Sequence, residues 1–231
     1  SGLINYDVSA IQADAGEKGL HADGAPIDPD FVPPASKPVL FGALLKNRNF
    51  LTIAMVMGLL FASYTGVLSN LVPFAMGEGL TADEGALLIS ALAVAGIVGK
   101  LVFGAVADKV DLRWGLGASM ALVIASMLVF SYFQGLTALM VGSVLIGLAA
   151  GGMLPVWGAL LAVLFGSANY GRVMGMMNPV IMPLTLSGAP LAGFIFDQTG
   201  AYTGAFLMFA AGLCVGVALL FFVDMNDRAE A

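Results

Sequence analysis

Six long apolar segments constrain the fold of this chain more than any other feature. Each is close to the ~20 residues that an α-helix needs to cross the hydrocarbon core of a membrane. The mean hydropathy is +0.95, and 10% of the 231 residues are charged, against about 25% in soluble domains. Without the alternating pattern of an outer-membrane barrel, the sequence predicts an all-α membrane protein, a six-helix bundle. The expected spans are Phe50–Met76, Glu84–Ala107, Leu112–Phe133, Leu136–Phe165, Val173–Phe196 and Ala201–Val223.

The first 45 residues differ in composition from the rest of the chain. Six of the fifteen acidic residues fall within the first thirty positions, and prolines recur from Pro26 to Pro38. Such a stretch buries too little apolar surface to offset its conformational entropy, so we expect a flexible segment. The predicted organisation is an acidic, proline-rich cytoplasmic linker over 1–45, a six-helix transmembrane unit over 46–225 and a cytoplasmic tail over 226–231.

The distribution of Lys and Arg predicts the orientation in the membrane. With six spans, the nine basic residues all fall on one side, in or beside the N-terminal segment, the second and fourth connections and the tail. Cytoplasmic loops carry the excess of positive charge. We therefore expect a multi-pass protein of the plasma (cell inner) membrane with both termini in the cytoplasm. The basic residues are Lys18, Lys37, Lys46, Arg48, Lys100, Lys109, Arg113, Arg172 and Arg228.

Several function classes are disfavoured by the residues that the spans lack. The single histidine, His21, lies in the polar N-terminal segment, and the single cysteine, Cys214, lies in an apolar run. A disulfide or a cysteine metal site is therefore not supported. The spans hold no combination of nucleophile, histidine and acid, so we expect no enzyme activity, no metal and no cofactor. The expected partners include membrane lipid and exclude nucleic acid.

Glycines spaced four apart predict close helix contacts, because small residues let two backbones approach. The double glycine and proline between Gly147 and Pro155 also predict a bend in the fourth span. The spaced pairs are Gly147 with Gly151, Gly171 with Gly175, and Gly212 with Gly216.

Lys100 is the most informative single residue. It lies seven residues before the end of the second span, or roughly 10 Å along a helix. A lysine at that depth costs a few kcal/mol unless it has a partner or extends to the interface. The chain has no acidic residue at a comparable depth, so an anionic substrate is one candidate partner. Interfacial snorkelling is the alternative.

The turn between the second and third spans carries a family resemblance. Gly104, Asp108, Lys109 and Arg113 resemble the signature G-x-x-x-D-R-x-G-R-K of the major facilitator superfamily. Gly104 and Asp108 match at the right spacing, Lys109 replaces the usual Arg, and Arg113 falls on the last basic position. The two positions before Arg113 depart from the motif, which makes the turn resemble the degenerate copy in the second half of such transporters.

The resemblance extends over about residues 40–224. FGSANYGRVMGMMNP followed by GAPLAGFIFDQTGAY is similar to the oxalate/formate antiporter and monocarboxylate porter branch. It implies the C-terminal six-helix half of a twelve-helix transporter, which moves small organic anions (mono- or dicarboxylates) by alternating access. The partner implied is an N-terminal half, or a second copy of the chain. The alternatives are a transporter of neutral solutes or drugs and a non-transporting membrane scaffold or sensor.

The resemblance also implies a conformational latch at this turn. Asp108 would face the positive N-terminal end of the fifth span, while Lys109 and Arg113 would hold anionic headgroups or carboxylates. Together with Gly104, these residues would stabilise one state and separate in the other, as alternating access requires. The alternative is that the charges only set the topology.

Five residues are candidate substrate contacts. Monocarboxylate-type porters carry a basic residue four positions before the motif glycine, where this chain has Lys100. The first and fourth helices of such a half line the central cavity, which adds Tyr64, Asn70 and Trp157, with ordinary packing as the alternative. Asn178, followed by a proline, would either bind a ligand or stabilise a broken turn.

Overall fold

The computed structural model describes residues 41–107, 111–166, 169–221 and 223. All of them belong to one compact unit, Pro38–Ala231. Most of the predicted linker and the whole predicted tail lie outside the described residues, as do Asp108 and Lys109 of the predicted latch.

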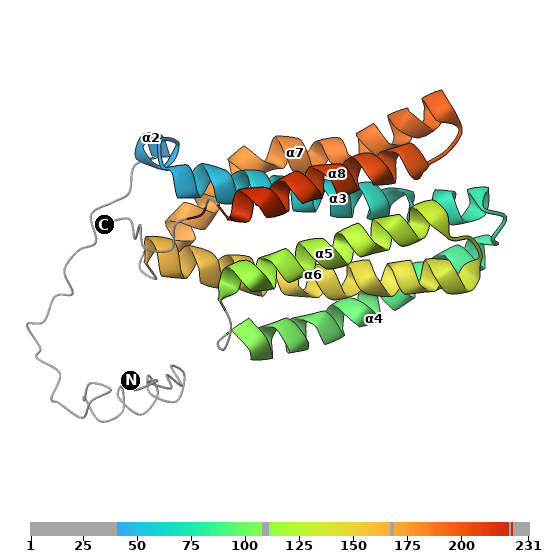
Figure 1. Cartoon of the computed structure of the whole chain (residues 1–231), viewed down its shortest axis with the longest axis horizontal. Helices are drawn as coiled ribbons and strands as arrows, with labels where there is room; N and C mark the ends of the chain where they lie inside the picture. Colours follow the sequence, from blue (N-terminus) through green and yellow to red (C-terminus); the bar gives the residue numbers. More distant parts are fainter. Residues whose placement is uncertain (1–40, 108–110, 167–168, 222, 224–231) are drawn as a thin grey trace, which may run out of the picture. The chain divides into compact units, whose positions relative to one another are not determined.

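Six long helices form the described part of the chain (Figure 1), and no strand occurs among its residues. Each is long and apolar enough to cross a membrane, so the predicted six-helix fold is confirmed. The predicted boundaries are correct to within a few residues. A short helix, α2 (Phe41–Leu44), is followed by α3 (Arg48–Gly77), α4 (Ala82–Ala107), α5 (Leu112–Tyr132), α6 (Leu136–Phe165), α7 (Tyr170–Thr199) and α8 (Thr203–Leu220).

Three of the helices begin at polar side chains that cap them. Asn47 accepts a hydrogen bond from the Phe50 amide at 2.9 Å before α3, and Asp111 caps α5. Before α4, the Glu84 amide donates to the Thr81 hydroxyl at 3.2 Å, and the Thr81 amide donates back to the Glu84 carboxylate at 2.8 Å. This reciprocal pair is a capping box. Polar side chains near the ends of these spans therefore fix where the three helices start.

The helices differ widely in how much of their surface is covered. The main contacts pair α4 with α6, α3 with α7, and α5 with both α6 and α8. In the most apolar window of α3 and of α6, 56% of the residues are buried, whereas the figures are 22% for α4 and 17% for α7. Among the described residues, α4 and α7 therefore each keep a face that no other helix covers.

Glycines allow α4 and α6 to meet backbone to backbone. A Cβ built on Gly151 would fall on the Gly96 carbonyl oxygen and lie 2.6 Å from the Lys100 amide nitrogen. A Cβ on Gly147 would fall on the Leu92 carbonyl oxygen. This pair confirms the predicted close approach. The other pairs differ: space is open around Gly171 and Gly175, and Gly212 with Gly216 faces only side chains of α3 and α5.

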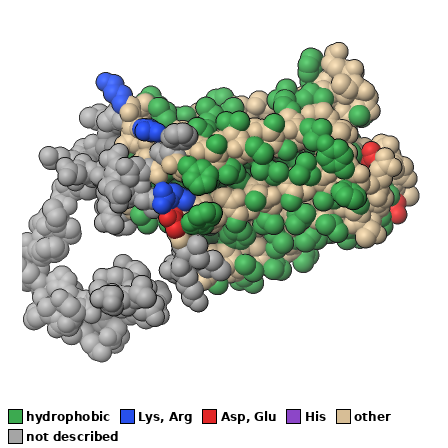
Figure 2. All heavy atoms as spheres, viewed as in Figure 1, with side chains coloured by type: hydrophobic (Ala, Val, Ile, Leu, Met, Phe, Trp, Pro, Cys, Tyr) green, Lys and Arg blue, Asp and Glu red, His purple; other side chains and the backbone are tan. Residues whose placement is uncertain are grey.

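Basic side chains gather at one end of the bundle. In Figure 2, the visible Lys and Arg side chains lie at that end beside one patch of Asp or Glu, two further patches of Asp and Glu lie at the opposite end, and hydrophobic side chains cover most of the surface between the ends. The basic end holds the starts of α3, α5 and α7, with Arg48, Arg113 and Arg172. We call this the basic end below.

Candidate functional site

Lys100 lies exposed on α4, seven residues before the helix ends at Ala107. Its amide nitrogen lies at the close contact with Gly151, so its side chain starts beside α6. Its side chain makes no hydrogen bond or ion pair with the part of the chain that the structure describes. The position of Lys100 on α4 is the predicted one, and its role as a substrate contact stays a prediction.

Tyr64 and Trp157 lie on the two most buried helices. Tyr64 on α3 is half-buried and packs against the core. Trp157 on α6 is 2% exposed, and its ring meets Phe61 edge to face at 6.0 Å between centroids. The indole Nε1 has no hydrogen-bond partner among the described residues. A buried donor without a partner costs free energy, which distinguishes Trp157 from an ordinary core residue.

Asn70 connects three elements through its side-chain amide. Its Nδ2 donates to the Gly66 carbonyl at 2.9 Å and to the Ala189 carbonyl of α7 at 3.4 Å. Its Oδ1 accepts a hydrogen bond from the Tyr202 hydroxyl at 3.3 Å. These contacts give Asn70 a structural role in this conformation, and its substrate role stays a prediction.

Asn178 lies on the exposed side of α7, and its Nδ2 donates to the Met174 carbonyl at 3.0 Å. The helix continues through the following Pro179 and through two further prolines. Each proline removes one amide donor from the helix. Helix α7 is therefore unbroken at Asn178, and the alternative of a broken turn is wrong.

Of the predicted latch, the described residues include Gly104 and Arg113. A Cβ built on Gly104 would meet nothing within 4 Å, so in this conformation none of the described helices packs closely against it. Arg113 lies at the start of α5 and donates to the carbonyl of Val223, three residues beyond the end of α8. The latch as a whole stays a prediction, because Asp108 and Lys109 lie outside the described part of the chain.

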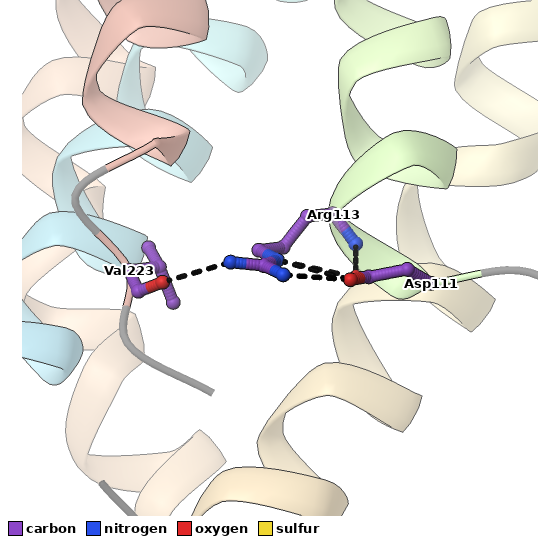
Figure 3. A network of polar contacts seen from close by, with 3 residues as sticks. All are labelled: Asp111, Arg113 and Val223. Atoms are coloured by element: carbon purple, nitrogen blue, oxygen red, sulfur yellow. Dashed lines mark hydrogen bonds and ion pairs between the residues drawn. The ribbon is translucent and has the colours of Figure 1, made fainter. Parts of the chain in front are cut away.

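The contacts of Arg113 form a small network at the basic end (Figure 3). Its Nη2 lies 2.8 Å from Oδ2 of Asp111, and its Nε donates to both carboxylate oxygens at 3.2 Å. Its Nη1 donates to the Val223 carbonyl at 3.3 Å. Asp111 also accepts a hydrogen bond from the Arg113 amide at 2.9 Å. The network therefore joins the start of α5 to the end of α8.

Sequence reasoning treated Asp111 only as a departure from the motif. An available signal was its place directly before an apolar run, where aspartate is a preferred N-cap. The hydrogen bonds and charge of Arg113 hold the pKa of Asp111 below its usual range.

Replacing Asp111 with alanine should lower the free energy of unfolding by about 1 kcal/mol at neutral pH, because the helix cap is lost. The pKa of Asp111 is lower in the folded state than in the unfolded state. Its ionised form therefore contributes fully to the free energy of unfolding when the pH is above the ordinary carboxyl pKa, and this contribution is lost as the pH falls through the folded-state pKa. Thermal unfolding in detergent at pH 7 and near pH 3 measures this. The variant should differ from the unmodified chain most at pH 7 and less near pH 3, whereas Glu78→Ala, at an exposed carboxylate outside this network, should differ little at either pH.

The structure distributes the candidate residues over four helices. Lys100 and Trp157 lie on the tightly packed pair α4 and α6, while Tyr64, Asn70 and Asn178 lie on the pair α3 and α7. No hydrogen bond joins Lys100 to the other four within the described residues. In the part of the chain that the structure covers, no group of His, Cys, Asp and Glu could hold a metal ion.

Comparison with known proteins gives consistent results for sequence and structure. The sequence model of the Major Facilitator Superfamily matches residues 50–231. Monocarboxylate transporter 13 of Rattus norvegicus is 28% identical over 187 residues, covering 77% of this chain and 42% of the relative. An MFS-type transporter of Aspergillus fumigatus is 26% identical over 177 residues, covering 73% of this chain and 40% of the relative.

Solved structures show the same fold at low sequence identity. The Escherichia coli fucose:proton symporter matches with a TM-score of 0.65 and 20% identity, over 83% of this chain and 47% of that one. A peptide transporter crystallised with alafosfalin matches with a TM-score of 0.66 and 17% identity, over 78% of this chain and 39% of the transporter. The chain thus spans about one-third to one-half of the length of these and the other similar proteins.

Proposed function

This chain belongs to the Major Facilitator Superfamily, and from that premise we propose that it acts as the C-terminal half of a secondary transporter. The proposed substrates are small organic anions, mono- or dicarboxylates, which cross the membrane by alternating access. Similarity to monocarboxylate transporters at 24–28% identity supports this substrate class.

Lys100 is the single observation that carries the substrate proposal. A cation within an apolar span is costly without a counter-charge, and the described residues supply none. A substrate carboxylate would provide that charge. Trp157 is the second proposed contact, because its indole N–H is buried without a partner. A lysine offers a point charge and not the two-pronged geometry of arginine, which suits small carboxylates of differing shape.

The uncovered faces of α4 and α7 support a partner. Lys100 lies on one of these two helices and Asn178 on the other. An N-terminal half, or a second copy of the chain, would cover both faces and enclose the substrate between the two units. The proposed latch of Gly104, Asp108, Lys109 and Arg113 would open and close at the basic end.

We propose that the basic end faces the cytoplasm at the plasma membrane. The described Lys and Arg residues at helix starts all lie at that end, and positive charge is retained on the cytoplasmic side. Both chain termini would then also be cytoplasmic.

Uptake into proteoliposomes tests the proposal. The chain is reconstituted alone and together with a candidate N-terminal half, and uptake of labelled mono- and dicarboxylates is measured against a labelled neutral sugar. We expect carboxylate uptake only from the combined halves or from a dimer. Efficient uptake by the monomeric chain would contradict the proposed role as a half.

Two other outcomes would support the alternative functions. Uptake of the neutral solute but not of carboxylates would indicate a transporter of neutral solutes or drugs. Absence of uptake with every partner, in a protein that still unfolds cooperatively, would indicate a membrane scaffold or sensor.

A further inference from the structure

A groove of about 410 Å³ lies between α5 and α8, next to the Asp111–Arg113–Val223 network. It exists because the residues of α5 that face α8 there are small. The walls are apolar on both sides. They are formed by Gly117, Ala118 and Ala121 of α5 and by Val217, Leu220 and Phe221 of α8.

The length of this α5–α8 groove matches hydrocarbon chains in a membrane. From Arg113 to Ala121 is eight residues, or about 12 Å at 1.5 Å per residue. One leaflet of the hydrocarbon core is about 15 Å deep, half of the ~30 Å of a typical bilayer. Ordered water needs several polar partners, which these walls do not offer. A hydrocarbon chain therefore fits the groove better than water does.

The mouth of the groove is polar and lies at the basic end, where α5 begins. Arg113 lines it, with its guanidinium fixed by the Asp111 carboxylate at 2.8 Å and by the Val223 carbonyl at 3.3 Å. Trp114, 67% exposed, lies beside it. Guanidinium groups match the geometry of phosphate, and tryptophan is enriched at the level of lipid headgroups.

A second groove lies between α4 and α6, and it lacks the combination of apolar walls with an arginine at the mouth that marks the α5–α8 groove. It is larger, about 630 Å³, and its residues include Ala91, Val94 and Met140. No charged residue lines it in the described part of the chain. It can therefore hold hydrocarbon but offers no contact that would select a headgroup.

We propose that the α5–α8 groove binds one phospholipid. One acyl chain lies along the groove, and the phosphate contacts Arg113 at its mouth. The site shares Arg113 with the proposed latch, but neither Lys100 nor the uncovered face of α7 takes part in it. Lipid binding can therefore fail while carboxylate uptake persists, and the reverse. A bound lipid would link the start of α5 to the end of α8 from the membrane side, parallel to the link that Arg113 makes to Val223.

Native mass spectrometry of the delipidated, detergent-purified chain tests the site, with phosphatidylglycerol as the added lipid. The unmodified chain should retain one lipid at concentrations at which further lipids dissociate. Arg113→Gln should weaken that first binding about tenfold, through loss of a charge-assisted contact. Ala121→Leu should weaken it similarly by filling the groove, and it leaves the charges untouched. Arg113→Lys should restore part of the affinity.

Matched controls separate this site from general lipid adhesion. Arg172→Gln removes a cation from the same end of the bundle. Ala91→Leu fills the α4–α6 groove, which no charged residue lines in the described part of the chain. Both substitutions should leave the binding of the first lipid unchanged. Equal binding by all variants would overturn the proposal. So would an equal loss in Arg113→Gln and Arg172→Gln, because that result would indicate only net charge.

Discussion

Carboxylate uptake by the assembled transporter is expected to fall at least about 100-fold when Lys100 is replaced by glutamine. Removing one partner of a desolvated charge pair typically costs 3–5 kcal/mol, and each 1.4 kcal/mol corresponds to a factor of ten. The loss should appear in binding as well as in transport. A carboxylate that raises the unfolding temperature of the unmodified chain should leave that of Lys100→Gln unchanged.

Two further variants test whether the loss of uptake in Lys100→Gln comes from the missing charge at this position. Lys100→Arg keeps the charge and restores the residue type found at this place in monocarboxylate-type porters, so it should retain uptake with an altered KM. Arg172→Gln removes an exposed cation at the start of α7 and should retain nearly full uptake. If Lys100→Gln transports carboxylates normally, Lys100 is a snorkelling residue and the substrate proposal fails.

Replacing Gly151 with alanine is expected to cause the largest loss of stability, about 3 kcal/mol. The added Cβ would meet the Gly96 carbonyl oxygen, the Lys100 amide nitrogen at 2.6 Å and the Gly99 carbonyl carbon at 2.8 Å. These are backbone atoms, which cannot rotate away as a side chain would. Overpacking therefore has to separate α4 from α6, at the upper end of the usual 1–3 kcal/mol.

Thermal unfolding in detergent measures this loss, and Gly175→Ala is the matched control. Nothing lies within 4 Å of a Cβ at Gly175, and the residue is in the interior of α7. Alanine there should be neutral or stabilising by up to about 1 kcal/mol through helix propensity. Equal destabilisation by the two substitutions would contradict the backbone contact between α4 and α6. Gly151→Ala should also reduce carboxylate uptake, because the backbone of Lys100 lies at that contact and would be displaced.

The membrane topology could be predicted because its causes are local in the sequence. The length of an apolar segment determines whether it can cross the hydrocarbon core, and the polar connections between the segments mark where each helix starts and ends. The family was also predictable, since Gly104 and Asp108 keep the spacing of a known motif within a single turn. The bounds of all six spans were therefore predicted to within a few residues.

The partners of individual side chains could not be predicted in the same way. Asn70 was a candidate substrate contact, yet its amide bonds Ala189 and Tyr202, more than a hundred residues away. Arg113 was assigned to a latch in which it holds anionic headgroups or carboxylates, and in the structure it bonds the Asp111 carboxylate and the Val223 carbonyl. Glycine spacing alone did not separate Gly147 and Gly151, which meet another helix, from Gly171 and Gly175, which do not.

The sequence by itself determined that this chain has six helices long and apolar enough to cross a membrane, and that basic residues stand at the starts of the first, third and fifth of them. These properties follow from hydropathy and charge, which each segment carries independently of its neighbours. Only the tertiary structure decided which faces remain uncovered and which polar groups already have partners. Those properties depend on which helices pack together, and packing joins residues that are far apart in the sequence.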